Sequence, residues 1–481
     1  MNTLRLFTAF ACLFLFFSCV ENEVEFFDVL IDIQPMGSAN IEPEVYGPLF
    51  PGDSISITLT PNQGYQFDQW SGTVGSYERT ITLFGTQDYK LTATLVSLPE
   101  LTDQVEIYNG PRIDPNPIFA VRLGARTSVT FNKQGEILNE YTFENRLGND
   151  IEMLPNGEFL GIFKPENRNG FSFGGSGGIL RRVTADQQTL WEYTIASETE
   201  LAHHDLELLP NGNVMTIVWE ENSREQAQAF GAQSERKLYT EKLVEINPNT
   251  NEIVWQWRSA DHLIQDVDQS ATNFGSIRQN PRKIDINYSP NPENGDWMHA
   301  NGIVYDETRD LIFMSVNFYD EVWVIDHSTT TAQAQTSSGG NYGVGGDLVY
   351  RFGNPATYGS DTAPIFDRVH HPNFSNDSHT QMLFFSNGGH DDVNQSTVFE
   401  LELPNQLLLD PVHEYLPTEV WRFTNPSLFH RIVSGAVKLP NGNVLICEGD
   451  FGFWEVTPAG QVVWLMKGYQ SGFWRAYPIN P

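Results

Sequence analysis

Residues 209–219, LPNGNVMTIVW, join a tight turn to an apolar run typical of a buried β-strand. The same Leu-Pro-Asn-Gly turn recurs at residues 154–157 and 439–442, each time ahead of a similar run. Proline sets φ at the first corner of such a turn, and asparagine and glycine tolerate the remaining backbone angles. A turn that recurs in this way predicts a repeat architecture built from β-hairpins.

A second hairpin also recurs along the chain. A strand-like run, a polar turn and an aliphatic-Trp pair follow one another at residues 183–191, 246–255 and 456–464, with a degenerate copy at 131–138. Two hairpins per repeat make a four-stranded sheet, which is the blade of a β-propeller. At about 60 residues per unit, the stretch from residue 100 to 481 predicts six blades. We therefore predict an all-β fold, a six-bladed β-propeller preceded by a small β-rich module.

The small module is predicted over residues 20–99, up to a Leu-Pro-Glu-Leu linker. Polar and apolar residues alternate with period 2 in short runs separated by turns, which is typical of half-buried strands. The segment 64–72, GYQFDQWSG, resembles the core motif of divergent internalin B-repeat modules of bacterial surface proteins. The resemblance implies that Tyr65, Phe67 and Trp70 are core aromatic residues and that the module carries no chemistry.

The first 19 residues predict a lipoprotein signal peptide. An apolar run from residue 6 to 17 follows Arg5 and is too short for a comfortable membrane span. The run stops at Ser18 and Cys19, which resemble the lipobox of bacterial lipoproteins, whose cysteine is lipidated. The resemblance implies a lipid anchor on Cys19 and a place in the cell envelope, on the outer membrane and exposed at its surface. The alternative is an ordinary secretory signal with an incidental cysteine.

Charge and cysteine content exclude several classes of function. The chain has 28 Lys and Arg against 61 Asp and Glu, a net charge of −33. Such a surface repels phosphate backbones, so we expect no nucleic-acid partner. Cys447 is the one cysteine of the mature body, which excludes an intrachain disulfide and a zinc framework. It lies in an apolar run, where we expect a buried, inert thiol.

The candidate catalytic residues are histidines at the start of predicted strands. They fall in three clusters, each entering the first strand of a different repeat: His203 and His204, His299, and His370 with His371. Because the innermost strands of a propeller line its central channel, we expect the three clusters to converge at one mouth. The alternative is that each histidine is a hydrogen-bonded surface group.

Converging imidazoles suit two kinds of chemistry. Neutral imidazoles bind metal ions, and Asp205 and Asp296 could join them as ligands or orient them. Alternatively, one imidazole acts as a nucleophile while the others move protons or stabilise charge. The spacing of the residues leaves both possibilities open.

Ordered motifs resemble those of the bacterial arylsulfate sulfotransferase (arylsulfotransferase) family over roughly residues 105–475. The motifs are the His-His-Asp at 203–205, DWMHAN at 296–301, YRFGNP at 350–355, HHPN at 370–373, and residues 434–448. The resemblance implies a six-bladed propeller that moves a sulfuryl group from an aryl sulfate to a phenol through a sulfated histidine. It implies no nucleotide donor, no cofactor and no metal ion.

The resemblance also implies roles for single residues. His370 matches the family's nucleophile better than His371, and His299 and one of His203 and His204 match its other catalytic histidines. Asn301 and Arg351 would contact substrate.

One position departs from the family pattern. The family carries a sulfate-binding arginine after an Ile-x-x-Ser strand, and Asn317 stands at that position here. Arg351 or Arg431 would then have to supply the missing positive charge. Because of this departure, two other functions stay open: a non-catalytic surface propeller that binds glycans or other polymers, and a metal-dependent hydrolase or lyase.

Overall fold

The computed structural model describes residues 25–166, 171–288, 294–389, 394–411, 415–468 and 472–479. The chain divides into two compact units, Met1–Pro99 and Glu100–Pro481. The predicted signal peptide and the lipidation of Cys19 lie outside the described residues and stay predictions. Within the described ranges, no helix has the length and apolar character needed to cross a membrane.

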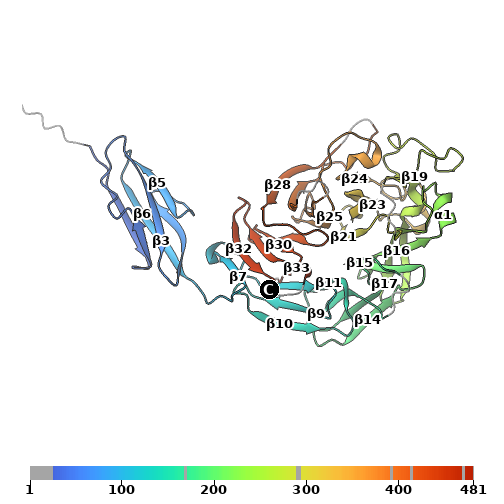
Figure 1. Cartoon of the computed structure of the whole chain (residues 1–481), viewed down its shortest axis with the longest axis horizontal. Coiled ribbons are helices and arrows are strands. Elements are labelled where there is room, and N and C mark those ends of the chain that lie inside the picture. The colour runs from blue at the N-terminus through green and yellow to red at the C-terminus, as the bar shows by residue number, and fades with distance from the viewer. Residues whose placement is uncertain are drawn as a thin grey trace, which may run out of the picture. The chain divides into compact units, whose positions relative to one another are not determined.

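The first unit is a small β-structure with two sheets of three strands each (Figure 1). One sheet pairs β1 (Val29–Gln34), β6 (Tyr89–Ser97) and β4 (Tyr65–Gly72), and the other pairs β2 (Ala39–Glu42), β3 (Ser54–Pro61) and β5 (Thr80–Phe84). Phe67 and Trp70 are buried in its core, and Tyr65 packs against them partly buried. These aromatic side chains therefore stabilise the module, as the resemblance to the B-repeat motif implied.

Strand pairing among the described residues of the second unit gives six sets of four strands, five of them consecutive in the chain. The second and third sets are joined through β11 and β15. The first set has β8 (Ile118–Arg122), β9 (Thr127–Phe131) and β10 (Ile137–Thr142), completed by β33 (Phe473–Pro478). The second has β11 (Leu147–Met153), β12 (Phe159–Phe163), β13 (Ile179–Val183) and β14 (Thr189–Thr194), and the third has β15 (Glu200–Leu208), β16 (Val214–Asn222), β17 (Leu238–Asn247) and β18 (Glu252–Arg258). The fourth has β21 (Ala300–Asp306), β22 (Leu311–Val316), β23 (Glu321–Asp326) and β24 (Tyr350–Phe352), and the fifth has β25 (Val369–Phe374), β26 (Gln381–Ser386), β27 (Thr397–Glu402) and β28 (Thr418–Thr424). The sixth has β29 (Gly435–Lys438), β30 (Val444–Glu448), β31 (Gly452–Val456) and β32 (Val462–Lys467), with β7 (Val105–Tyr108) along its outer edge.

Short elements decorate the loops between these strands. They are the pair β19 (Leu263–Ile264) and β20 (Ile284–Asp285), the helices α1 (Arg224–Ala229) and α2 (Thr331–Ala334), and the 3-10 turns η1 (Gly110–Arg112), η2 (Ser259–His262), η3 (Asn317–Tyr319) and η4 (Pro355–Tyr358).

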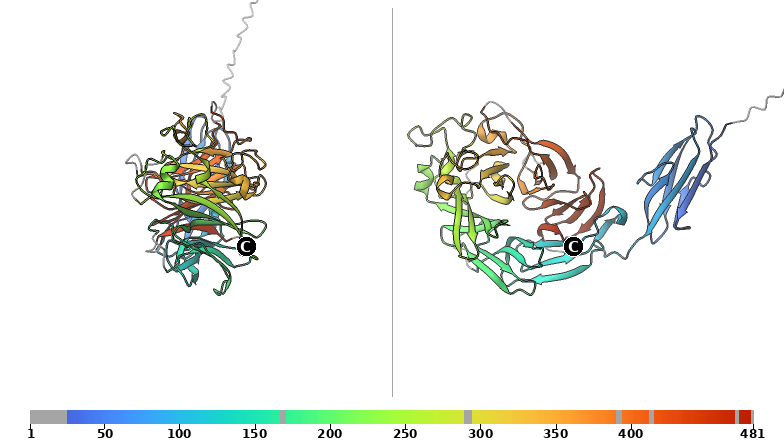
Figure 2. Two further views of the ribbon diagram at one scale, coloured as in Figure 1. Left: turned by 90° about the vertical axis from the view of Figure 1, so that its right-hand side faces the viewer. Right: turned by 180° about the vertical axis from the view of Figure 1, so that it is seen from behind.

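The sheets follow one another around a common centre, and the two ends of the unit close the ring (Figures 1 and 2). The C-terminal strand β33 pairs with β8, and the early strand β7 pairs with the late strand β32. Radial repetition of this kind leaves only short, protected sheet edges, and the pairing of β33 with β8 closes the ring. The predicted all-β propeller fold is confirmed.

The repeated turns lie where the sequence placed them. Each Leu-Pro-Asn-Gly turn connects the first and second strands of a set, β11 to β12, β15 to β16 and β29 to β30. Its glycine has a φ of +81°, +83° and +86° in the three copies, a left-handed conformation that favours glycine. The leucine side chain of each turn is buried, so the turn also anchors the hairpin on the core.

Candidate active site

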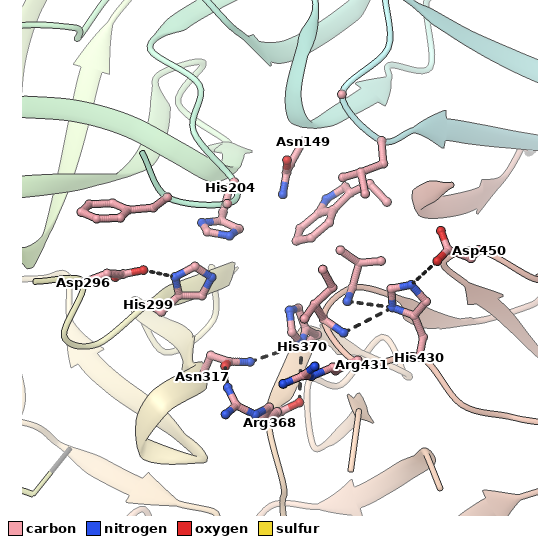
Figure 3. A pocket seen from close by; sticks show the side chains of 18 of the residues that line it. Asn149, His204, Asp296, His299, Asn317, Arg368, His370, His430, Arg431 and Asp450 are labelled. Atoms are coloured by element: carbon pink, nitrogen blue, oxygen red, sulfur yellow. Dashed lines mark hydrogen bonds and ion pairs between the residues drawn. The ribbon is translucent and has the colours of Figure 1, made fainter. Parts of the chain in front are cut away.

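A cavity of about 1220 Å³ opens among the innermost strands and the loops beside them (Figure 3). Residues from all six sets of strands line it, or from the loops next to them. One part of the wall is apolar and consists of Leu123, Phe173, Phe318, Phe429, Ile432, Phe451 and Trp474. The other part is polar and includes three histidines, His204, His299 and His370, that the sequence marked as candidates.

Irregular backbone turns these histidines toward one another. The innermost strands β11, β15, β21, β25 and β33 all break register against their neighbours. Left-handed φ angles accompany the breaks: +57° at His204 and +55° at His299, and +59° at Arg368 just ahead of β25. Such bulges re-aim side chains next to active sites, and the strained backbone is stable only when its surroundings hold it.

His370 is the buried imidazole at the centre of the polar wall. Its Nδ1 lies 2.6 Å from the Asn387 side-chain oxygen and 3.4 Å from the Arg368 backbone carbonyl oxygen. Both of these partners are acceptors, whereas the donor Asn317 Nδ2 lies farther away, at 3.5 Å. The short contact decides the tautomer: Nδ1 carries the ring proton and donates it to Asn387. The Nε2 atom then keeps its lone pair, and the His370 residue lines the cavity.

The Asn387 amide can face His370 in one orientation only. Its Nδ2 donates to the backbone oxygens of His430 at 2.6 Å and Val433 at 2.8 Å. Because both of those groups are acceptors, the amide oxygen must point toward His370. Burial and the nearby charge of His299 lower the pKa of His370 to about 3, so the ring is neutral at physiological pH.

His299 has the opposite electrostatic character. Its Nδ1 lies 2.5 Å from a carboxylate oxygen of Asp296, which is itself buried. Burial alone would lower the pKa of His299, but the charge and hydrogen bond of Asp296, with help from Glu241, raise it above its ordinary value. His299 is therefore the imidazole in the cavity that holds a proton most readily. Among the residues that the structure describes, its Nε2 has no hydrogen-bond partner.

His204 completes the group, supported from behind. Its ring contacts His299 edge-on with centroids 4.7 Å apart, and its Nδ1 lies 2.7 Å from Nδ1 of His203. His203 in turn contacts Glu241 at 2.9 Å and stacks on Trp219. Burial lowers the pKa of His203 and His204 well below the usual value, so both rings are neutral, hydrogen-bonded groups.

Positive charge in the cavity comes from Arg368 and Arg431, with Lys164 at its edge. The Arg368 guanidinium donates to the Asn317 side-chain oxygen at 3.4 Å and lies over the Phe318 ring. This corner of the cavity therefore holds a cation although Asn317 stands in place of arginine. The cation is Arg368, which reaches the corner from just ahead of β25. Figure 3 shows the guanidinium groups of Arg368 and Arg431 on the His370 side of the cavity.

A model of the arylsulfotransferase (ASST) family matches residues 125–463, which is more than half of the chain. The chain belongs to the arylsulfotransferase family. Membership supports sulfuryl transfer as its general chemistry and a sulfotransferase type of enzyme. A model of the divergent InlB B-repeat domain matches residues 31–96 and confirms the expected nature of the first unit.

Comparison with individual proteins adds little. No curated protein matches the chain significantly. A putative 6-phosphogluconolactonase from Bacteroides fragilis has 10% identity and a TM-score of 0.36, with 76% of this chain and 99% of that chain covered. A periplasmic gluconolactonase, PpgL, from Pseudomonas aeruginosa has 11% identity and a TM-score of 0.35, with 76% and 99% covered. Both structures are only distantly similar to this chain.

Four of the predicted site residues of this arylsulfotransferase-family chain lie together at the cavity: His204, His299, Asn317 and His370. His203 lies behind His204 and does not line the cavity. His371 points away from His370, against Tyr477 with ring centroids 6.0 Å apart, so the structure separates the paired histidines.

Asn301 and Arg351 do not line the cavity either. The Asn301 amide donates to the Val369 backbone oxygen at 2.9 Å and so joins two neighbouring sheets. Arg351 lies in β24, where its guanidinium forms a buried ion pair with Glu321. The predicted alternative cation Arg351 is therefore already neutralised elsewhere, whereas Arg431, the other alternative, does line the cavity.

The sequence reasoning missed Arg368, Asn387 and His430. Arg368 stands two residues before His370, and His430 is the neighbour of Arg431, so proximity along the chain was the available signal. His430 accepts from the backbone N–H of Val433 at 3.0 Å through Nδ1, and its Nε2 lies 3.4 Å from Asp450. The described residues contain no group of three or more His, Cys, Asp or Glu placed to hold a metal ion.

Proposed function

We propose that the chain transfers a sulfuryl group from an aryl sulfate to a phenolic acceptor through a sulfated His370. The observation that carries the proposal is the hydrogen bond of 2.6 Å between His370 Nδ1 and Asn387. It supports a neutral ring whose Nε2 lone pair faces the cavity. A neutral imidazole of this kind is a nucleophile that needs no further deprotonation.

In the first half-reaction, Nε2 of His370 attacks the sulfur of the aryl sulfate. The N–S bond forms as the bond from sulfur to the aryl oxygen breaks, and the electron pair leaves on that oxygen. Protonated His299 donates its Nε2 proton to the leaving phenolate, while Asp296 holds the ring from the other side. The His370 ring now carries a positive charge beside its sulfonate, and Nδ1–H still donates to Asn387.

Little covalent chemistry is required of the remaining residues, because sulfuryl transfer resembles phosphoryl transfer in depending on positioning and charge stabilisation. Arg368 is placed to stabilise the equatorial oxygens of the sulfuryl group, since it lines the cavity and its backbone oxygen contacts the His370 ring. Arg431 adds a second positive charge from the same wall. Asn317 orients Arg368 through its amide oxygen.

The second half-reaction returns the enzyme to its starting state. The phenolic acceptor gives its proton to His299, which is neutral after the first step, and the phenolate oxygen attacks sulfur. The N–S bond breaks and its electron pair returns to Nε2 of His370. The balance is one aryl sulfate and one phenol consumed, and one aryl sulfate and one phenol formed.

The direct test is to trap the covalent intermediate. Purified protein incubated with 4-nitrophenyl sulfate and no acceptor should release one equivalent of nitrophenolate and gain the mass of one SO₃ on the peptide that contains His370. His370→Ala should abolish both signals, and His371→Ala, a matched change on the neighbouring residue, should retain them. An adduct that survives in His370→Ala would disprove the assignment of the nucleophile.

We also propose that Cys19 anchors the protein to the cell envelope through lipid. The support is the apolar run that ends at Ser18 and Cys19. Stable attachment needs more than one acyl chain, which lipidation of such a cysteine provides. A surface-attached enzyme of this kind would act on phenols outside the cytoplasm.

A further inference from the structure

A second, smaller cavity of about 320 Å³ adjoins the active-site cavity, and we call it the basic annex. It is lined by Leu123, Gly124, Arg126, Asn145, Arg146, Lys164, Pro165 and Glu166. Three of these residues, Leu123, Gly124 and Lys164, also line the active-site cavity. The two cavities are therefore neighbours, with Lys164 at their shared border.

The charge of the annex is opposite to that of the chain. Three cations, Arg126, Arg146 and Lys164, face a single acid, Glu166, in a protein with 61 acidic and 28 basic residues. A local excess of one sign in a cleft attracts ligands of the other sign. The annex is thus suited to an anion that the rest of this acidic surface would repel.

The two arginines of the annex are held in place without being neutralised. Arg146 Nε donates to the Gly124 backbone oxygen at 2.9 Å, and Arg126 donates to the backbone oxygen of Glu144. The Glu144 carboxylate lies instead within 3.4 Å of Arg181. Within the described part of the chain, neither annex arginine forms an ion pair with a carboxylate. Each guanidinium has five N–H donors, so most of them remain for a ligand.

The size of the active-site cavity also favours a ligand larger than a single aromatic ring with one sulfate. Its volume of about 1220 Å³ exceeds the range of about 300–1,000 Å³ that usually holds a drug-sized ligand. A single aromatic ring with one sulfate would leave much of this space empty. Leu123, which belongs to the apolar wall, and Lys164 line both cavities, so the space not filled by such a donor adjoins the annex.

We infer that the phenolic acceptor carries a second anionic group, a carboxylate or a sulfate, which the basic annex binds. The inference rests on the proposed function and specifies the acceptor class. The reacting hydroxyl lies at His370, the aromatic body lies along the apolar wall, and the distal anion contacts Arg126, Arg146 and Lys164. The annex thereby selects acidic phenols over neutral ones.

The test compares acceptors that differ in the distal charge alone. Phenols with a carboxylate on alkyl chains of increasing length, starting with 3-(4-hydroxyphenyl)propanoate, are each paired with the corresponding amide. At the best length we expect kcat/KM for the carboxylate to exceed that for the amide by about tenfold or more, on the scale of a hydrogen bond to a charged group. The ratio should fall as salt is raised, because the annex arginines are exposed.

Charge-removing variants locate the effect. Arg146→Ala and Arg126→Ala should each lower the carboxylate-to-amide ratio several-fold, and the double variant should bring it close to one. Arg224→Ala removes an exposed arginine that lines neither cavity and should leave the ratio unchanged. A wild-type ratio near one at every chain length, or a ratio that the annex variants do not move, overturns the inference.

The outcome also separates this inference from the proposed function. If the enzyme transfers sulfate equally well to amides and carboxylates, the annex is not an acceptor site, and the proposed sulfuryl transfer is unaffected. Absence of transfer to every acceptor sinks the proposed function instead. In that case calorimetric titration of the wild-type protein with the carboxylate and with its amide tests whether the annex binds an anion. Tighter binding of the carboxylate that is lost in Arg146→Ala supports the inference, and equal binding of the two compounds refutes it.

Discussion

Removal of the Asn387 side chain should slow sulfation of the enzyme by more than the accompanying loss of stability can explain. Asn387 accepts the Nδ1 proton of His370 at 2.6 Å, and this bond becomes charge-assisted when the ring gains positive charge in the transition state. A hydrogen bond to a charged group contributes about 1.5–3 kcal/mol. At 1.36 kcal/mol for each factor of ten, Asn387→Ala should reduce the single-turnover rate roughly 10- to 150-fold.

The same substitution also has a structural cost, which the assay must separate from the effect on catalysis. Asn387→Ala leaves the buried backbone oxygens of His430 and Val433 without their donor, at a cost of about 1–3 kcal/mol of stability. Asn373 offers a matched control, because its Nδ2 donates to the backbone oxygens of His371 at 3.0 Å and Ala436 at 2.8 Å. Asn373→Ala should therefore lower the melting temperature to a similar extent.

The assay is the burst of nitrophenolate from 4-nitrophenyl sulfate, measured beside thermal unfolding of both variants. We expect the burst rate to fall at least tenfold further in Asn387→Ala than in Asn373→Ala, at comparable loss of stability. Equal rates in the two variants would refute the reasoning, since the Asn387 effect would then be a consequence of looser packing between sheets.

Three further predictions follow from the charges in the cavity and at the N-terminus. Protonated His299 is the acid of the first step, so kcat/KM for the donor should fall as pH rises through its raised pKa, above 6.5, and Asp296→Asn should move the fall to lower pH. The pH profile of kcat/KM checks this, and a profile that Asp296→Asn does not shift would contradict it. Arg368→Asn should slow transfer about a hundredfold. Adding Asn317→Arg returns a cation to the same corner and should recover at least tenfold of that loss. A double variant as slow as Arg368→Asn alone would count against a sulfate-binding role for this cation. Cys19→Ser should move the protein from the membrane fraction to the soluble fraction, or block its processing, as followed by immunoblot, and unchanged fractionation would contradict the anchor.

The fold was accessible from sequence because its signals are local. The turn at residues 209–212 needs proline, asparagine and glycine within four positions, and its strand partner follows at once. The core positions of Phe67 and Trp70 followed from the resemblance of residues 64–72 to a B-repeat motif, since a bulge between Phe67 and Gln69 breaks strict alternation. The left-handed backbone of His204 and His299 was not predictable, because the preference of histidine for positive φ is too weak to mark single residues. The surrounding sheets must hold the strained backbone.

The position of Arg368 in the candidate active site shows most clearly what a sequence pattern omits. The pattern compares residues position by position, and at the end of β22 it finds Asn317 where the family has arginine. The structure brings the segment just ahead of β25 to the same corner, so that Arg368 reaches Asn317 from a different set of strands. The guanidinium does not need to come from a particular strand, because an anion responds to where the positive charge lies in the cavity and not to its place in the chain. Asn317 then orients Arg368 through its amide oxygen, 3.4 Å from the guanidinium. It also avoids a second positive charge beside Arg368, since two unit charges about 4 Å apart near a protein surface repel each other by about 4 kcal/mol.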